Sequence, residues 1–293
     1  MLGIFFTLSI ALVEKFFFDV INKSTNPNII IVYKSIVSTF FMYICFILFG
    51  NFINFFNDLS FCILIAIEFL VIFYSKYLFY LFKHRFVYIS YALFSSIYLT
   101  PLISYFYKDW FGFSNNIKFI FEDFTHLFIF SLTLFIMNSI YFLHKLKSNK
   151  EKNSTPLSFF ELFLLIIFGF FMANAIYFSV SMIQKYDPFS LYSVIFIFHI
   201  IIFGIIGIYK RESFKLNSFQ ILTLPSVIIA LLLSIFGAKL LAVEFFAVFK
   251  RLGSLYAGYF FDYKNNTNYK FDTLEIIMLL TITFFVLSIY ILF

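Results

Sequence analysis

The chain has 293 residues, of which 62% are hydrophobic and only 12% are charged, with a mean hydropathy of +0.97 and a formal net charge of +6. A single soluble core could not enclose so much apolar surface, so the composition excludes a soluble globular domain and predicts a multi-pass membrane protein. The positive charge is expected in loops beside anionic lipid, and it does not indicate nucleic acid as a partner.

Ten apolar segments follow one another along the chain, each about as long as the 20 residues that a helix needs to cross a bilayer. We expect spans at 2–22, 28–50, 58–82, 86–107 and 125–145 in the first half, and at 158–183, 188–209, 216–238, 241–261 and 273–293 in the second. The first should be retained, because the N-terminus lacks a basic segment and a cleavage site. The interval from Gly237 to Glu244 is the shortest separation, and merging the spans beside it would give nine.

Lys and Arg gather in alternate loops between these spans. The clusters are Lys83 and Arg85; Lys145, Lys147, Lys150 and Lys152; and Lys210, Arg211 and Lys215. By the positive-inside rule these odd-numbered loops face the cytoplasm and both termini lie outside. We therefore expect a multi-pass protein of the cell (inner) membrane.

The most polar stretch, residues 144–154, lies near the midpoint, and residues 147–157 are expected to be a basic linker between residues 1–146 and residues 158–293. The two halves have matching features: LTPLISYFYKD (99–109) aligns without a gap to LGSLYAGYFFD (252–262), and Pro27 and Pro188 occupy equivalent turns. Because each half has an odd number of spans, the second enters the membrane upside down. The predicted fold is an all-α polytopic membrane protein with ten transmembrane helices as two inverted five-helix repeats, the framework of many alternating-access transporters.

The run EFFAVFKRLGSLYAGYFFD (244–262) places Lys250 and Arg251 in the middle of an apolar span. Charges at that depth need a partner or a water-filled cavity. Adjacent helical positions point about 100° apart, so we expect at least one of the two cations to face a central cavity or an acid on another helix, such as Glu14 or Glu68. The alternative is that both snorkel to the interface.

This run resembles the penultimate helix of the EamA family of the drug/metabolite transporter (DMT) superfamily, in which a Lys-Arg-Leu/Thr-Ser-type sequence precedes small and aromatic residues and a terminal acid. The matching residues are Lys250-Arg251-Leu252-Gly253-Ser254 and Gly258-Tyr259-Phe260-Phe261-Asp262. The family ends in Glu and a basic residue, whereas this chain has Asp262-Tyr263-Lys264. Tyr33-Lys34 stands where the family's second span often opens with an aromatic-Arg pair. The resemblance implies five plus five spans, metabolite transport without an ATP domain or a metal, and both termini inside, opposite to the orientation that the loop charges predict.

Polar side chains within the spans are few, and five of them are the candidate substrate-binding residues: Glu14, Lys34, Asn174, Lys250 and Arg251. Glu14 precedes Pro27 by 13 residues and Asn174 precedes Pro188 by 14, so the repeat places these two side chains at similar depth near the midplane. Glu68 and His199 are further embedded polar residues: Glu68 could pair across helices, and His199 is interpreted as a hydrogen-bonded membrane histidine rather than a proton relay.

We therefore expect a secondary transporter of a small metabolite by alternating access, and the surplus of embedded cations favours export of an amino acid or organic anion. The alternative is a membrane-embedded enzyme or assembly factor that handles lipid-linked sugars. No catalytic motif was found, so we predict no enzyme activity, no catalytic residues, no cofactor and no metal site. Cys45 and Cys62 are expected to be inert thiols. The expected partners are the small-molecule substrate and the lipid bilayer, with the chain acting as a monomer or homodimer.

Overall fold

The computed structural model describes residues 1–22, 26–50, 58–82, 86–108, 121, 123–148, 157–265 and 273–292. This part of the chain is helical and contains no strand. The helices are α1 (Leu2–Asn22), α2 (Pro27–Phe49), α3 (Leu59–Leu81), α4 (Phe86–Phe94), α5 (Ser96–Tyr107), α6 (Phe124–Ser148), α7 (Phe159–Lys185), α8 (Pro188–Tyr209), α9 (Ser218–Leu240), α10 (Val243–Asn265) and α11 (Thr273–Leu292). The loop cations Lys83, Arg85, Lys150 and Lys152, and the side chains of Gly258–Asp262, lie outside the described residues.

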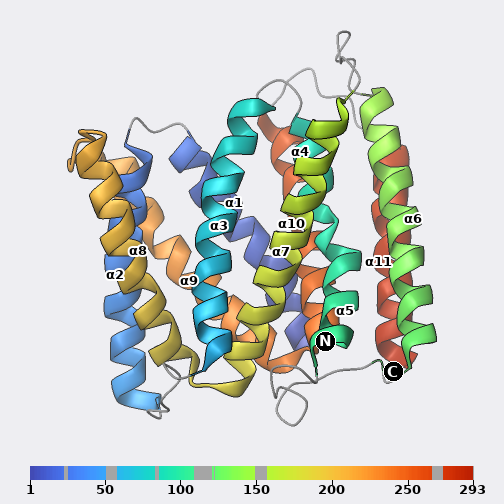
Figure 1. Ribbon diagram of the computed structural model, residues 1–293, viewed down its shortest axis with the longest axis horizontal. Helices are drawn as coiled ribbons and strands as arrows, with labels where there is room; N and C mark the ends of the chain where they lie inside the picture. The colour runs from blue at the N-terminus through green and yellow to red at the C-terminus, as the bar shows by residue number, and fades with distance from the viewer. Residues whose placement is uncertain are drawn as a thin grey trace.

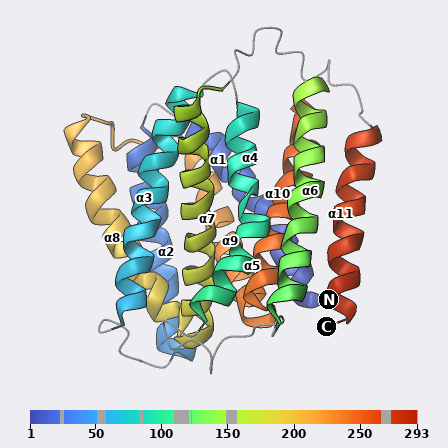
Figure 2. The same cartoon turned by 45° about the vertical axis from the view of Figure 1, so that its right-hand side comes forward.

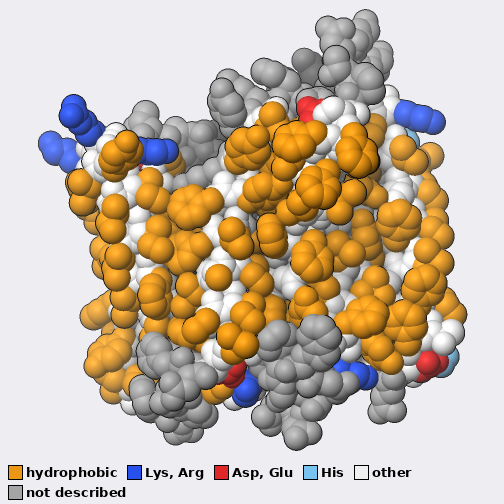
Figure 3. All heavy atoms as spheres, in the orientation of Figure 1, with side chains coloured by type: hydrophobic (Ala, Val, Ile, Leu, Met, Phe, Trp, Pro, Cys, Tyr) orange, Lys and Arg blue, Asp and Glu red, His pale blue; other side chains and the backbone are white. Residues whose placement is uncertain are grey.

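Seven of the described helical segments are long and apolar enough to cross a membrane, namely α2, the joined α4 and α5, α6, α7, α8, α9 and α11. Shorter apolar stretches lie in α1 (Leu2–Glu14) and α3 (Leu59–Ser75). On the face seen in Figure 3, apolar side chains cover the middle of the bundle, whereas Lys and Arg gather at its two ends. The chain is an all-α multi-pass membrane protein, as its composition predicts.

Successive helices run in alternating directions along one bundle axis, apart from α4 and α5, which follow one another (Figure 1). Both chain termini lie at the same end, which we call the termini side; the other end is the opposite side. Turning the bundle keeps α8 at one edge and α6 and α11 at the other (Figure 2). The main packing pairs are α2 with α8 and α9, α1 with α9 and α10, α3 with α7, α4 with α7, α5 with α6, α7 and α10, and α6 with α11.

The prolines in the predicted turns start two of these helices. Pro27 and Pro188 each occupy the first turn, where a missing N–H costs nothing, and the Asp187 side chain accepts a hydrogen bond from the Ser190 N–H. The predicted spans 216–238 and 241–261 are separated by a break in the helix. Leu241 is extended, and α10 begins two residues later at Val243. α9 and α10 are therefore separate helices, and the merged alternative is wrong.

The predicted span 86–107 is interrupted at Ser95, between α4 and α5. Pro101 cannot donate a backbone hydrogen bond within α5, and the hydroxyls of Ser95 and Ser96 donate to the carbonyls of Ala92 and Leu93, which bends a helix. α7 approaches this junction closely at Gly169. The linker also begins later than predicted, because α6 continues to Ser148.

α10 lies at the centre of the bundle, and Val243 to Phe249 are all buried. A Cβ atom on Gly253 would lie 2.5 Å from the carbonyl oxygen of Leu8, and one on Gly237 would lie 2.4 Å from Thr7 Oγ1. These two glycines therefore let α1 pack closely against α10 and α9. Ser104 and Ala257, which lie in the two aligned span endings, are both buried.

Polar contacts tie helices together at the termini side of the bundle. The Asp58 carboxylate begins α3, accepts a hydrogen bond from the Ser60 N–H, and lies 2.8 Å from Lys185 Nζ and 2.5 Å from the Tyr186 hydroxyl. Burial by itself raises the pKa of Asp58, but the hydrogen bonds from Lys185, Tyr186 and Ser60 outweigh it and hold the pKa below its ordinary value.

A second set of polar contacts joins helices at the opposite side. The Glu212 carboxylate, in the turn between α8 and α9, accepts hydrogen bonds from the backbone N–H groups of Asn28 and Ile29 at 2.9 and 3.0 Å. The Asn26 side-chain amide donates to the carbonyl of Ser213. The start of α2 is thereby fixed to the end of α8.

Candidate functional site

Six ionisable side chains from five helices come together in the interior of the bundle. We call them the charged cluster: Glu14 of α1, Lys34 of α2, Glu68 of α3, His199 of α8, and Lys250 and Arg251 of α10. All six lie well inside their helices rather than at the ends. The cluster therefore lies inside the bundle, away from the ends of the helices.

Two pairs form the body of the cluster. Lys250 Nζ lies 3.6 Å from Glu14 Oε1, and His199 Nε2 lies 3.7 Å from Glu68 Oε2. Lys34 links the pairs, because it interacts electrostatically with both carboxylates. The sequence analysis expected Lys250 or Arg251 to face a central cavity or an acid on another helix. Lys250 faces such an acid, Glu14.

Arg251 points away from Lys250, as adjacent helical positions require. Its Nε donates a 3.0 Å hydrogen bond to Ser96 Oγ at the α4–α5 junction, and its charge interacts with that of Glu14. Among the residues that the structure describes, this is the only hydrogen bond of the guanidinium. Its two terminal nitrogens therefore keep the geometry that binds a carboxylate through two parallel hydrogen bonds.

The side chains of the cluster are partly accessible despite their interior position. The exposed fraction is 34% for Glu14, 20% for Lys250, 21% for Glu68 and 12% for His199. A charge at mid-bilayer costs about 2.5–3.5 kcal/mol on insertion scales, and pairing or contact with water lowers that cost. Each of these four side chains keeps part of its surface uncovered by the rest of the described chain.

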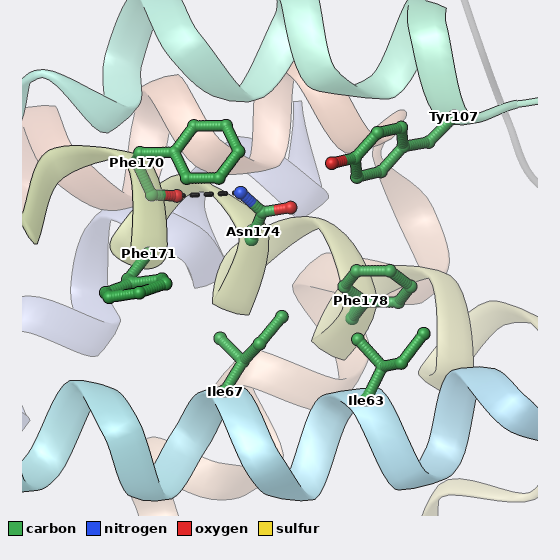
Figure 4. A pocket seen from close by; sticks show the side chains of 7 residues that line it. All are labelled: Ile63, Ile67, Tyr107, Phe170, Phe171, Asn174 and Phe178. Atoms are coloured by element: carbon green, nitrogen blue, oxygen red, sulfur yellow. Dashed lines mark hydrogen bonds between the residues drawn. The ribbon is translucent and has the colours of Figure 1, made fainter. Parts of the chain in front are cut away.

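An aromatic pocket of about 220 Å³ lies between α3 and α7. Its lining residues are Ile63, Ile67, Tyr107, Phe170, Phe171, Asn174 and Phe178 (Figure 4). The Asn174 side-chain amide and the Tyr107 hydroxyl are its polar groups, and Asn174 Nδ2 donates a 2.9 Å hydrogen bond to the Phe170 carbonyl one turn earlier. The pocket can hold an apolar or aromatic group and offers little to a charged one.

Four of the five predicted site residues, Glu14, Lys34, Lys250 and Arg251, meet in the charged cluster. The structure places the fifth, Asn174, in the aromatic pocket rather than beside Glu14. Glu68 also belongs to the cluster, in line with the expectation that it could pair across helices. His199 lies beside it, but its Nε2 makes no hydrogen bond within the described part of the chain. The sequence analysis did not identify Ser96 as a contact of Arg251. The available signal was Pro101, which interrupts helix hydrogen bonding near this position.

Within the described part of the chain, no group of three or more His, Cys, Asp or Glu side chains could hold a metal ion. No family model, no curated protein and no solved structure matches the chain. The resemblance to the EamA family stays a prediction from the sequence.

Proposed function

We propose that the chain is a ten-span secondary transporter of the EamA type that moves a small carboxylate-bearing metabolite across the cell (inner) membrane by alternating access. The observation that carries the proposal is the charged cluster, in which ionisable side chains from five helices meet inside the bundle and four of them are partly exposed. Helices that only spanned the membrane would be more stable with apolar side chains at these positions.

The packing of the helices supports an inverted repeat. If α1 corresponds to α7, α2 to α8, α3 to α9, α4 and α5 to α10, and α6 to α11, a twofold relation pairs several of the contacts between helices with one another. α1 packs on α9 and α7 packs on α3; α1 packs on α10 and α7 packs on α4 and α5. The pairs that such an axis maps onto themselves, α2 with α8, α5 with α10 and α6 with α11, are also in contact. Corresponding helices run in opposite directions (Figure 1).

The charge of the cluster supports an anionic substrate. Lys34, Lys250 and Arg251 stand against the carboxylates of Glu14 and Glu68, which leaves one positive charge when His199 is neutral. One carboxylate would neutralise it, and the terminal nitrogens of Arg251 are the donors best suited to receive it. An amino acid or a small organic acid fits this description.

The test is counterflow in proteoliposomes loaded with a pool of amino acids and organic acids. Arg251→Gln should abolish or strongly reduce counterflow of a carboxylate solute at unchanged protein level, and Arg251→Lys should restore it only in part because the two-pronged geometry is lost. Arg211→Gln, on the exposed α8–α9 turn, is the matched control and should transport normally. The proposal is wrong if no solute in the pool undergoes counterflow, or if Arg251→Gln transports like the wild type. Turnover of a lipid-linked sugar donor would favour an enzyme instead.

A further inference from the structure

Glu68 and His199 form a pair in the charged cluster. The proposed binding of a carboxylate by Arg251 does not explain why this pair is present. The two groups lie 3.7 Å apart, and His199 Nε2 is buried without a hydrogen bond to any residue that the structure describes. The rings of Phe69, Phe196 and Phe203 surround the imidazole edge-on at 5.5–5.9 Å between ring centres. A carboxyl group and an imidazole at this separation need only a small movement to share a proton.

The groups around the pair have opposing effects on whether it binds a proton. Lys34 on α2 interacts electrostatically with both members, and Lys250 on α10 interacts with Glu68. Tyr192 on α8 interacts electrostatically with Glu68 and Glu14. Its hydroxyl lies 3.4 Å from the uncharged hydroxyl of Ser179 on α7. Arg251 and Glu14, which interact with each other, are the remaining charged members of the cluster.

The two cations favour an ionised carboxylate beside them, whereas the three phenyl rings disfavour any charge. Such opposing influences allow a group to gain and lose a proton at moderate cost, which is what a coupling site requires.

We infer that the Glu68–His199 pair binds one proton from water and that this proton binds together with the substrate carboxylate, which makes the chain a proton–anion symporter. This inference rests on the proposed function. The proton adds to the Glu68 carboxylate or to His199 Nε2 and returns to water on the other side of the membrane, with no other bond made or broken.

The sign of the coupling follows from the charge of the cluster. A proton raises its net charge from one to two, and a bound monoanion returns it to one. Proton and anion therefore increase each other's affinity, and by linkage they do so by the same factor. Transport then follows the combined gradients of the two ions.

The first test needs no solute. Infrared difference spectra of the purified protein are recorded as a function of pH, and the carbonyl band of protonated Glu68 is identified by its loss in Glu68→Gln. His199→Asn should change the proton affinity of that group by about tenfold or more, as coupled sites do. Glu275→Gln removes another buried carboxylate, which is bonded to Tyr141 between α11 and α6, and should leave the Glu68 band and its titration unchanged. A Glu68 band with the same titration in wild type and His199→Asn would overturn the inference.

The second test uses proteoliposomes that contain a pH-sensitive dye, with the carboxylate solute that gives the largest counterflow. Wild type and Glu275→Gln should move protons in the same direction as the solute. In Glu68→Gln and His199→Asn, the number of protons moved per solute, measured in the same vesicles, should fall at least about tenfold. Counterflow without proton flux in wild type would overturn symport and leave the proposed function standing. Absence of counterflow, together with coupled titration of Glu68 and His199, would overturn the proposed function and leave the proton site.

Discussion

Removing one charge of the Glu14–Lys250 pair should harm stability more than removing both, and the two single changes should differ. Glu14→Gln leaves three cations around the single carboxylate of Glu68, so the net charge of the cluster rises from one to two. Lys250→Gln lowers the net charge to zero and leaves Glu14 with Lys34 and Arg251 as neighbours. Glu14→Gln should therefore be the more destabilising single change, and the double variant should recover much of the loss because it restores a net charge of one.

The magnitude follows from the 3.6 Å separation of Lys250 Nζ and Glu14 Oε1. With an effective dielectric constant of about 20, the Coulomb attraction is about 4–5 kcal/mol before the cost of desolvating both groups. The exposed fractions of 34% for Glu14 and 20% for Lys250 screen part of that attraction. We therefore expect a coupling energy of about 1–3 kcal/mol, the range found for groups in direct contact.

The assay is a double-mutant cycle on the free energy of unfolding, measured by denaturant titration in mild detergent for wild type, both single variants and the double variant. A matched cycle combines Glu14→Gln with Lys147→Gln, an exposed cation near the end of α6, and should be additive within about 0.5 kcal/mol. Additivity of the Glu14 and Lys250 changes, or a Lys250→Gln variant less stable than Glu14→Gln, would refute the electrostatic account of the cluster.

Three further predictions concern packing, pH and orientation. Gly253→Ala places a Cβ 2.5 Å from a backbone oxygen of α1 and should lower the free energy of unfolding by about 1–3 kcal/mol, whereas Gly204→Ala meets its nearest atom only at 4.0 Å and should be tolerated. Because the pKa of Asp58 is held below its ordinary value, its stabilisation is present above the unfolded pKa and disappears as pH falls through the lower folded value. The difference in melting temperature between wild type and Asp58→Asn should therefore be largest near pH 7 and shrink below about pH 4. In a background without the native cysteines, an impermeant thiol reagent should label Asp123→Cys in intact cells and Lys210→Cys only after permeabilisation, and the reverse would invert the proposed orientation.

The sequence predicted the helices well where proline or polar residues mark their ends. The spans expected to start at 28 and 188 begin at Pro27 and Pro188, since proline fits the first turn and disfavours helix in the residue before it. The ends of α6 and α10 were placed too early, because helices can continue past the apolar stretch into polar residues such as Ser148 and Asn265. Hydropathy reports burial in lipid, and backbone hydrogen bonding does not stop at that boundary.

The partners within the site could not be predicted in the same way. In a soluble helix an apolar stripe marks the face that turns inward, but here both lipid and protein interior are apolar, so the sequence does not distinguish the faces. The repeat gives the depth of a residue and not its direction around the helix. Asn174 illustrates the difference, because it shares an expected depth with Glu14 and yet faces the aromatic pocket.

The charged cluster has one more basic side chain than it has carboxylates. This excess favours a site that binds an anion over polar contacts that only join helices. Polar side chains that only join helices are most stable when every charge has a partner, as Glu275 does with Lys145 at 3.3 Å between α11 and α6. The charged cluster has three basic side chains for two carboxylates, and the guanidinium of Arg251 makes one hydrogen bond, to neutral Ser96, within the described part of the chain. An arrangement that leaves a cation without full compensation in the middle of a bundle is costly unless an anion from outside completes it. The same imbalance explains why a proton at Glu68 and His199 would strengthen anion binding, since it increases the charge that the anion neutralises.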